Sequence, residues 1–212
     1  MGGEAVMIDP ALDHLVYAGP DLAAAVARVA EVTGVRPVEG GPHPGLGTRN
    51  FLLGLGGRAY LEIIGPDTGR PAPERPRPFG IDELTAPALV GWALGVEPGG
   101  LDERVAKARR AGYDPGEPAA MSRRRPDGTL LAWRLTPLRS GPLPFLIDWG
   151  TTVHPSVGLP VVPLRSLAII HPAPETIRPA LAALGATVTT RAGETPALLA
   201  EIGVDGRAFT LN

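Results

Sequence analysis

One order of predicted elements occurs three times along the chain, and this repeat constrains the fold more than any other feature. Each copy has an apolar strand-like run, an amphipathic helix that ends at a glycine, a short extended segment and two more strand-like runs. The copies are predicted at residues 8–66, 88–155 and 160–212, and the third is the weakest match. The proline-rich stretch 67–87 is predicted to be a linker. The predicted fold class is α+β, with three βαβββ modules.

Capping residues predict where helices begin and end. In the first copy Asp21 suits a helix cap and Gly34 suits a left-handed stop. In the third copy Pro179 fits a helix only in its first turn, so Thr176 is predicted to cap that helix. Asp205-Gly206 is a favoured two-residue turn and is predicted to join the last hairpin.

Composition excludes several classes of protein. Of the 212 residues 44% are hydrophobic and 20% charged, and no apolar run reaches the length of about 18 residues that a membrane span needs. The formal net charge of −2 argues against a nucleic-acid partner. Without cysteine, thiol nucleophiles and zinc–thiolate sites are excluded, so any metal must bind His, Asp or Glu. The opening MGGEAVM does not resemble a secretion signal, so a cytoplasmic location is expected.

His14 and Glu62 are the first candidates for a site. His14 lies in the first strand of its copy and Glu62 in the last, and in a βαβββ module these strands can be neighbours. Side chains on adjacent strands come within about 5 Å, so an imidazole and a carboxylate there can share one divalent ion. The alternative is structural: Asp13-His14 is a polar pair at a strand edge, and Glu62 pairs with an arginine such as Arg58.

The strings LDHLVYAGPDL and YLEIIGP resemble the vicinal oxygen chelate superfamily, and GGPHPGLGTRN, RPDGTLLAWRLT and PFLIDWGTTVHP resemble its glyoxalase-like subfamily. The resemblance runs from about residue 12 to residue 155 and extends more weakly to the last copy. It implies modules that form cupped mixed sheets with helices packed outside, and a divalent metal cation as cofactor. His14 and Glu62 match two of the metal-ligand positions of that superfamily.

The second copy departs from the metal pattern of the superfamily. Aligning the copies puts Trp92, Ala93 or Leu94 where the next ligand belongs, and Ile147 opposite Glu62. None of these side chains binds a divalent cation. Two protein ligands completed by water suit a weakly held Mg²⁺ or Mn²⁺, and a protein without metal is the alternative.

Further candidates flank the strands. Asp148, His43 and His154 are candidates for proton transfer, although a turn-capping role for Asp148 and an exposed position for each histidine are the structural alternatives. A larger set is predicted to bind substrate, through hydrogen bonds, stacking or an anion clamp: Asn50, Trp92, Trp133, Trp149 and Arg124. Arg124 belongs to a cluster of three arginines whose structural alternative is a solvated loop. His171 is predicted to be structural.

Two functions from different classes follow from these residues. The first is a metal-dependent enzyme, of the lyase, isomerase or dioxygenase type, in which a cation at His14 and Glu62 polarises adjacent oxygens of a small substrate. The second is a metal-free protein that binds a small apolar ligand in the same cleft. The third module is expected to leave a sheet edge or face to cover, which favours a homodimer.

Overall fold

The computed structural model describes residues 8–204 and 207–212, and its element order confirms the α+β class with repeated βαβββ units. The first unit has β1 (Leu12–Ala18), α1 (Leu22–Thr33), β2 (Val38–His43), β3 (Thr48–Gly56) and β4 (Ala59–Pro66). The second has β5 (Ala88–Gly95), α2 (Leu101–Arg110), β6 (Ala119–Arg124), β7 (Leu130–Leu135) and β8 (Phe145–Asp148). The third has β9 (Leu164–His171), α3 (Pro174–Leu184), β10 (Thr189–Ala192), β11 (Ala197–Val204) and β12 (Arg207–Leu211).

The first helix begins and ends where the sequence predicts, whereas the third ends at the predicted glycine, Gly185, but begins elsewhere. The Asp21 carboxylate accepts a hydrogen bond from the Ala24 backbone N–H at 3.0 Å, and Gly34 ends α1 with φ 71°. In α3, however, Pro174 occupies the first turn and Pro179 lies inside the helix. The prediction of a Thr176 cap is wrong, because Pro174 suits the first position of a helix and α3 begins there, with Ala173 as its cap, three residues earlier than predicted. The predicted Asp205-Gly206 turn lies outside the described residues.

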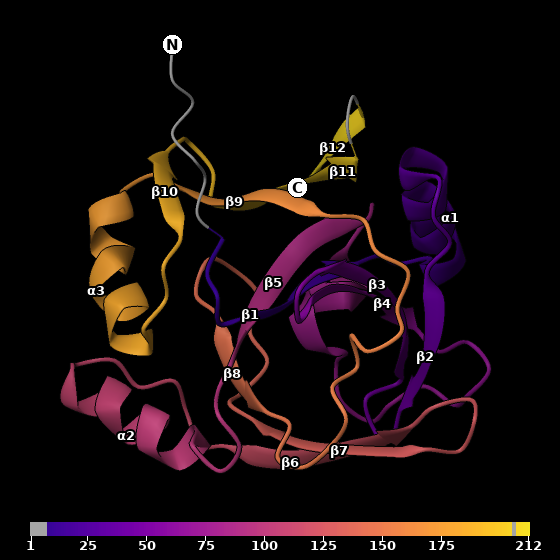
Figure 1. Cartoon of the computed structure of the whole chain (residues 1–212), viewed down its shortest axis with the longest axis horizontal. Helices are drawn as coiled ribbons and strands as arrows, with labels where there is room; N and C mark the ends of the chain where they lie inside the picture. Colours follow the sequence, from indigo (N-terminus) through magenta and orange to yellow (C-terminus); the bar gives the residue numbers. More distant parts are fainter. Residues whose placement is uncertain (1–7, 205–206) are drawn as a thin grey trace.

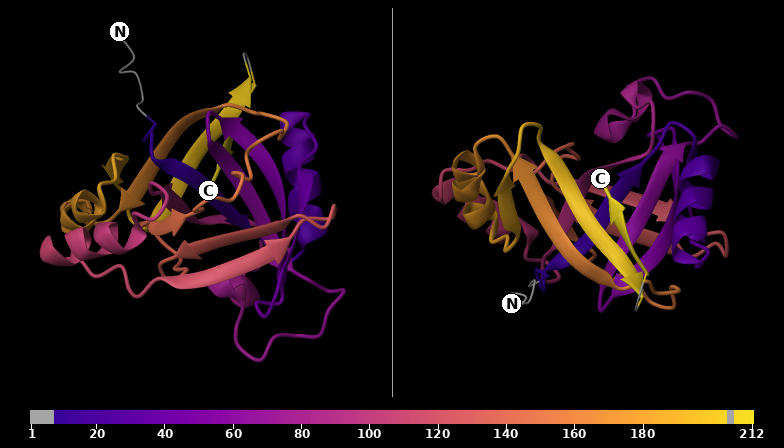
Figure 2. Two further views of the ribbon diagram at one scale, coloured as in Figure 1. Left: turned by 60° about the horizontal axis from the view of Figure 1, so that its bottom comes forward. Right: turned by 90° about the horizontal axis from the view of Figure 1, so that it is seen from above.

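The first two units share one strongly curved sheet. Its eight strands run in the order β2-β3-β4-β1-β5-β8-β7-β6, with β1 and β5 antiparallel at the centre. Within each unit the first strand pairs in parallel with the last, β1 with β4 and β5 with β8. Figure 1 shows the curvature of this sheet, and Figure 2 shows β6 and β7 forming the floor of the resulting cup. The outermost strands β2 and β6 come close enough for Arg123 to donate a hydrogen bond to the Gly40 carbonyl.

Alternation along the strands separates two apolar cores. In β1, Val16 and Ala18 face the inside of the cup, while Leu15 and Tyr17 face the helices and the third unit. The same alternation in β5 puts Ala93 inside the cup and Trp92 on the helix side. Because side chains of a strand alternate between its faces, this parity decides which residues reach a ligand in the cup.

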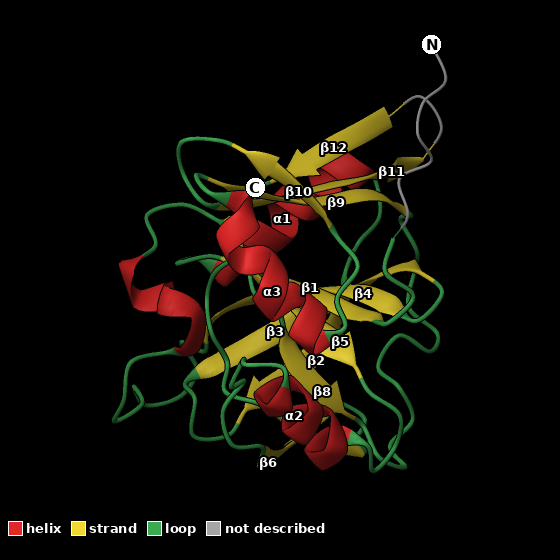
Figure 3. Cartoon of the chain, turned by 90° about the vertical axis from the view of Figure 1, so that its left-hand side faces the viewer, coloured by secondary structure: helices red, strands yellow, loops and turns green. Residues whose placement is uncertain are grey.

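The third unit covers the convex side of the large sheet. Its four strands form a separate sheet in the order β10-β9-β11-β12, which lies across the large sheet in Figure 2. Backbone and side-chain hydrogen bonds tie it down: the Leu89 N–H donates to the Asn212 carbonyl at 2.8 Å, and Arg104 donates to the Leu184 carbonyl at 3.1 Å. Figure 3 shows the neighbouring helices α2 and α3 on the outside of the strands. Buried apolar residues of the two sheets also pack into one cluster, so the third unit shares the hydrophobic core of the large sheet.

The proline-rich connection between the first two units is a wall of the cup as well as a link. It contains the short 3₁₀ segment Pro78–Glu83, and Pro78 and Phe79 line the cavity inside the cup. Phe79 is buried and has φ 61°, a left-handed conformation that is unfavourable for a bulky residue. This conformation turns the Phe79 ring towards Phe145, with ring centroids 6.0 Å apart. Among the described helices none has the length and apolar character that crossing a membrane requires.

Candidate functional site

A small cavity of about 40 Å³ lies inside the cup. The first unit contributes nearly all of its polar side chains, which are His14, His43, Asn50, Tyr60 and Glu62. The second unit contributes a mainly apolar wall of Met121, Trp133, Leu135, Leu138, Phe145, Ile147 and Trp149, with one charged residue, Arg123. The cavity is therefore polar on one side and aromatic and aliphatic on the other.

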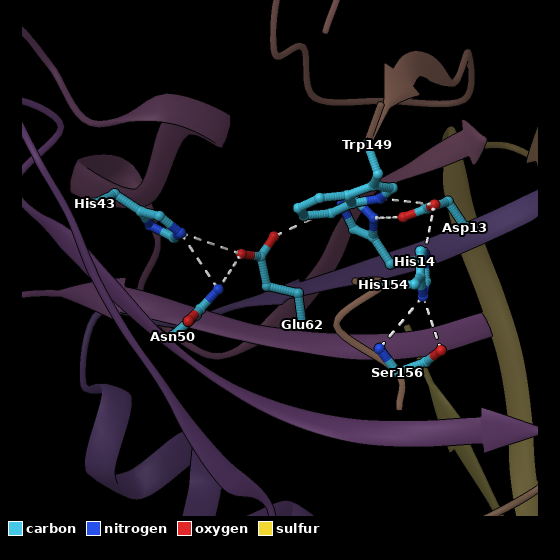
Figure 4. Close-up of polar contacts among 8 residues, drawn as sticks. All are labelled: Asp13, His14, His43, Asn50, Glu62, Trp149, His154 and Ser156. Carbon is cyan, nitrogen blue, oxygen red and sulfur yellow. Dashed lines mark hydrogen bonds and ion pairs between the residues drawn. The ribbon is translucent and has the colours of Figure 1, made fainter. Parts of the chain in front are cut away.

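Asp13 is the centre of a buried hydrogen-bond network beside the cavity (Figure 4). Its Oδ1 lies 2.7 Å from His14 Nδ1, and its Oδ2 lies 3.0 Å from both Trp149 Nε1 and His154 Nε2. Burial by itself raises the pKa of this carboxyl, but the hydrogen bonds from His14 and His154 outweigh it and lower the pKa to about 2. Asp13 is therefore ionised near neutral pH, and all three neighbouring nitrogens must donate to it.

The Asp13 carboxylate fixes the ring of His14. Because His14 Nδ1 donates to Asp13, a neutral His14 carries a lone pair on Nε2. That Nε2 lies 3.8 Å from Glu62 Oε2, and both side chains are buried. The two atoms are too far apart for a direct hydrogen bond. His14 Nε2 and Glu62 Oε2 are thus two electron-pair donors that face each other across a narrow gap, and the adjacency predicted from the sequence is present.

Glu62 is held from its other oxygen by Asn50, which also lies beside His43. Asn50 Nδ2 donates to Glu62 Oε1 at 2.6 Å and also lies 3.3 Å from His43 Nε2. His43 Nδ1 lies 3.0 Å from the Thr48 hydroxyl, so a neutral His43 with the proton on Nδ1 satisfies both contacts. Burial lowers the pKa of His43 to about 4, although the charge of Glu62 opposes this shift. His43 is consequently neutral near pH 7 and its Nε2 is unprotonated.

Tyr60 joins the two halves of this polar wall. Its ring stacks on His14, with centroids 4.8 Å apart, and packs against the His154 ring in a T-shaped arrangement, with centroids 5.7 Å apart. Burial together with the charges of Asp13 and Glu62 raises the pKa of the Tyr60 hydroxyl well above its ordinary value. Tyr60 therefore stays protonated and acts as a hydrogen-bond donor at the cavity.

The second unit does not repeat the metal pattern. His14 pairs with Tyr60 across β1 and β4, and in the same register Ala93 pairs with Phe145 across β5 and β8. The counterparts of His14 and Glu62 are thus Ala93 and Ile147, as the alignment of the copies predicts. Among the residues that the structure describes, no three His, Asp or Glu side chains are arranged to hold one metal ion.

Several predicted site residues lie away from the cavity. Asp148 Oδ2 accepts from the Gly99 N–H at 2.9 Å and its Oδ1 accepts from the Gly150 N–H at 2.7 Å, which is the turn-capping alternative. Trp92 is fully buried on the helix side of β5, where its indole donates to the Pro142 carbonyl. Both positions follow from strand parity: Asp148 and Trp92 are each one residue out of phase with a residue that faces the cup, Ile147 and Ala93.

Two other predicted residues support structure outside the cavity. Arg124 is exposed and donates to the Gly128 carbonyl at 2.9 Å, in agreement with the solvated-loop alternative. His154 is buried behind the cavity, where Nε2 donates to Asp13 and Nδ1 accepts from the Ser156 N–H at 3.3 Å. His171 accepts a hydrogen bond from the Ala173 N–H, as expected of a structural histidine.

Sequence reasoning missed Asp13, Tyr60 and Arg123. Asp13 appears in the pattern as the residue next to His14 and was expected only as its polar partner at a strand edge. Tyr60 shares the strand face of Glu62, so the alternation of β4 was a usable signal for it. Arg123 could not be separated from its neighbours in the arginine cluster without knowing the parity of β6.

Comparisons with known proteins identify the family and the fold. The sequence profile of a family described as "Glyoxalase-like domain" matches residues 12–185. No curated protein matches the chain. A crystal structure of a hypothetical protein from Staphylococcus aureus is similar at 10% identity, covering 95% of this chain and 98% of that chain with a TM-score of 0.63. Methylmalonyl-CoA epimerase from Mycobacterium tuberculosis is 18% identical, with coverage of 70% and 91% and a TM-score of 0.43.

Proposed function

The chain belongs to the glyoxalase-like domain family of the vicinal oxygen chelate superfamily, and from this premise we propose that it is a divalent-cation-dependent enzyme acting on a small, oxygen-rich substrate. The single observation that carries the proposal is the pair of facing electron-pair donors, His14 Nε2 and Glu62 Oε2, which lie 3.8 Å apart on two nearly buried side chains that line the cavity. When His14 is neutral, neither atom carries a proton with which to form a hydrogen bond to the other. A cation between them would accept an electron pair from each.

The chemistry of the donors fits such a cation. A histidine that binds a metal through one ring nitrogen commonly donates the other N–H to a carboxylate, as His14 does to Asp13. The buried groups near the gap are two carboxylates, Asp13 and Glu62, and one guanidinium, Arg123, which leaves one negative charge without a partner. Since Ala93 and Ile147 supply no ligands, water and substrate oxygens must fill the remaining positions, as is usual for Mg²⁺ and Mn²⁺.

When bound, the cation would supply Lewis-acid polarisation of the substrate oxygens. The protein then contributes the proton transfer, and of the three predicted candidates only His43 lines the cavity. Its Nε2 is unprotonated near neutral pH, because burial lowers the pKa of His43 to about 4. Asn50 touches Nε2 only through a long 3.3 Å contact, which an acidic substrate proton can replace. Tyr60 provides a protonated hydroxyl that can donate to a substrate oxygen.

A metal-free ligand-binding protein is the second candidate, and the second unit favours it. Trp133 and Trp149 lie with ring centroids 5.1 Å apart, and Phe79 and Phe145 continue this aromatic wall. Such a wall binds a planar apolar ligand through surface burial alone. The two candidates differ in one measurable property, the dependence of ligand binding on a cation at His14 and Glu62.

Metal content is the decisive test. The protein is purified without chelator or affinity metal, dialysed against Mg²⁺, Mn²⁺, Fe²⁺ or Zn²⁺, and analysed by mass spectrometry beside the variants His14→Ala and Glu62→Gln. We expect near-stoichiometric metal in the wild type and its loss in both variants. His171→Ala is the matched control, because His171 lies outside the cavity and should leave metal content unchanged. A wild type that retains none of these metals contradicts the cation-dependent enzyme and leaves the binding protein.

A further inference from the structure

Among the residues that the structure describes, Arg123 is the one lysine or arginine that lines the cavity, and it is almost fully buried. It projects from β6, where the two ends of the curved sheet meet, and its guanidinium donates to the Gly40 carbonyl of β2. The other cavity-lining residues of β6 to β8 are apolar or aromatic. A guanidinium in such surroundings needs either a function or a strong structural partner.

The described residues offer this guanidinium little compensation. No carboxylate among them lies within the 4.0 Å of an ion pair, and the hydrogen bond to Gly40 uses one of five N–H donors. Burial lowers the pKa of Arg123, while the nearby Tyr60 and Glu62 only partly oppose that shift. Arginine nevertheless remains protonated at physiological pH. The cavity thus contains a fixed positive charge with donors to spare.

The backbone leaves room for this arrangement. A Cβ atom on Gly40 would lie 3.1 Å from Arg123 Nη2 and 2.1 Å from Asn50 Oδ1. Gly40 thereby allows the Arg123 guanidinium and the Asn50 amide to pack against the same stretch of β2. Asn50 in turn donates to Glu62, so the cation of Arg123 and the gap between His14 and Glu62 lie along one continuous wall.

We propose that Arg123 binds the carboxylate of the substrate, which makes the substrate a small carboxylic acid with a second oxygen that faces the gap between His14 and Glu62. The planar guanidinium matches a carboxylate through two parallel hydrogen bonds. A monoanion adds one negative charge to a cavity in which Glu62 already lies near Arg123, whereas a phosphate dianion would add two. The role of the second oxygen rests on the proposed function, because that oxygen would bind the cation. Binding of the carboxylate to Arg123 does not rest on it, since this contact needs no metal.

Tryptophan fluorescence provides a test that does not require turnover. Trp133 and Trp149 line the cavity, so occupancy should change their emission. Lactate is titrated against lactamide, its neutral analogue, in the presence of chelator and again with Mg²⁺. We expect lactate to bind about tenfold or more tightly than lactamide, and Arg123→Gln to abolish that preference, since a hydrogen-bonded charge contributes on this scale. Arg124→Gln is the matched control: it removes the same charge from the adjacent exposed residue and should preserve the preference.

Folding and competing anions are controlled separately. If Arg123→Gln melts below the assay temperature, Arg123→Lys replaces it, and we expect that variant to weaken lactate binding several-fold without changing lactamide binding. Equal affinities for lactate and lactamide in the wild type overturn the inference, as does a preference that survives Arg123→Gln or tighter binding of inorganic phosphate. Absence of lactate binding under both conditions also overturns it.

The two proposals fail in distinguishable ways. In one outcome the protein holds no metal, and it prefers lactate through Arg123 equally well with chelator and with Mg²⁺. This outcome supports the anion site and contradicts the proposal of a cation-dependent enzyme. Metal bound at His14 and Glu62 without any preference for lactate keeps the proposed function and contradicts the role of Arg123.

Discussion

Asp13 and His14 are consecutive residues of β1, yet their side chains are hydrogen-bonded to each other at 2.7 Å. Consecutive side chains of a regular strand point to opposite faces. The pairing of β1 with β5 explains the exception, because its register shifts between Leu12 and His14 and leaves Asp13 as the extra residue of a β-bulge. The bulge brings both side chains to the cavity side, where Asp13 orients His14.

Replacing Asp13 by Asn should lower the affinity of the site for a metal ion while leaving the fold intact. The amide cannot accept hydrogen bonds at both of its ends from His14, His154 and Trp149, so the ring of His14 loses its fixed orientation. We expect about 10–100-fold weaker binding of Mn²⁺ by titration calorimetry, the usual effect of losing such a support. Asp67→Asn controls for loss of a buried carboxylate elsewhere. Unchanged affinity in Asp13→Asn would show that His14 needs no support.

His43 should make the protein less stable in mild acid. The pKa of His43 is about 4 in the folded protein and about 6.5 in the unfolded chain, so between these values the unfolded state binds the extra proton. Stability is full above pH ~6.5 and falls as the pH drops towards 4, by about 3 kcal/mol. We expect His43→Gln to flatten this part of the pH dependence of urea unfolding, and His171→Gln to leave it unchanged. A slope retained in His43→Gln contradicts the assignment.

The missing half of the metal pattern should be restorable. Ala93 and Ile147 occupy the second-unit positions that correspond to His14 and Glu62, and both lie on the cavity side of the sheet. We expect the double variant Ala93→His with Ile147→Glu to bind Zn²⁺ at least tenfold more tightly than the wild type, because four donors would then converge. The larger side chains should lower stability by about 1–3 kcal/mol. Zinc affinity that stays at the wild-type value would mean that the two pairs do not face one centre.

Asp148 should prove structural. Its carboxylate accepts from the N–H groups of Gly99 and Gly150 and thereby joins the turn before α2 to the end of β8. We expect Asp148→Asn to lower the melting temperature, at a cost of about 1–2 kcal/mol, while metal content and lactate binding stay as in the wild type. Loss of either binding property in a folded Asp148→Asn protein would return this residue to the site.

The order of helices and strands was predictable from the sequence, because it depends on the local spacing of apolar residues. The site was predictable only for residues that lie on neighbouring strands of one unit. The repeat of elements and the proximity of His14 and Glu62 follow from periodicity and from β1 and β4 being neighbours in a βαβββ unit. The network around Asp13 does not, because a bulge leaves no mark in the alternation of residues. Side chains alternate between the two faces of β6, so Arg123 reaches the cavity and its neighbour Arg124, the predicted residue, does not.

Contacts between distant segments were also beyond the sequence pattern. Phe79 lies in a stretch predicted to be a linker, and its left-handed backbone, which brings the ring to the cavity, is not encoded by any local preference for phenylalanine. His154 meets Asp13 across 141 residues, so its role depends on the closed cup. The expected homodimer stays a prediction.

The unequal halves of the cup have a stereochemical consequence. Two identical units related by a pseudo-twofold axis would accept a small molecule in two opposite orientations. Here carboxylate, imidazole and amide groups line one side, and indoles, aliphatic chains and a single guanidinium line the other. A ligand with one charged end can fit this lining in one orientation, which presents a fixed face of its central carbon to His43. Divergence of the two copies thus replaces two equivalent orientations of a bound ligand by one.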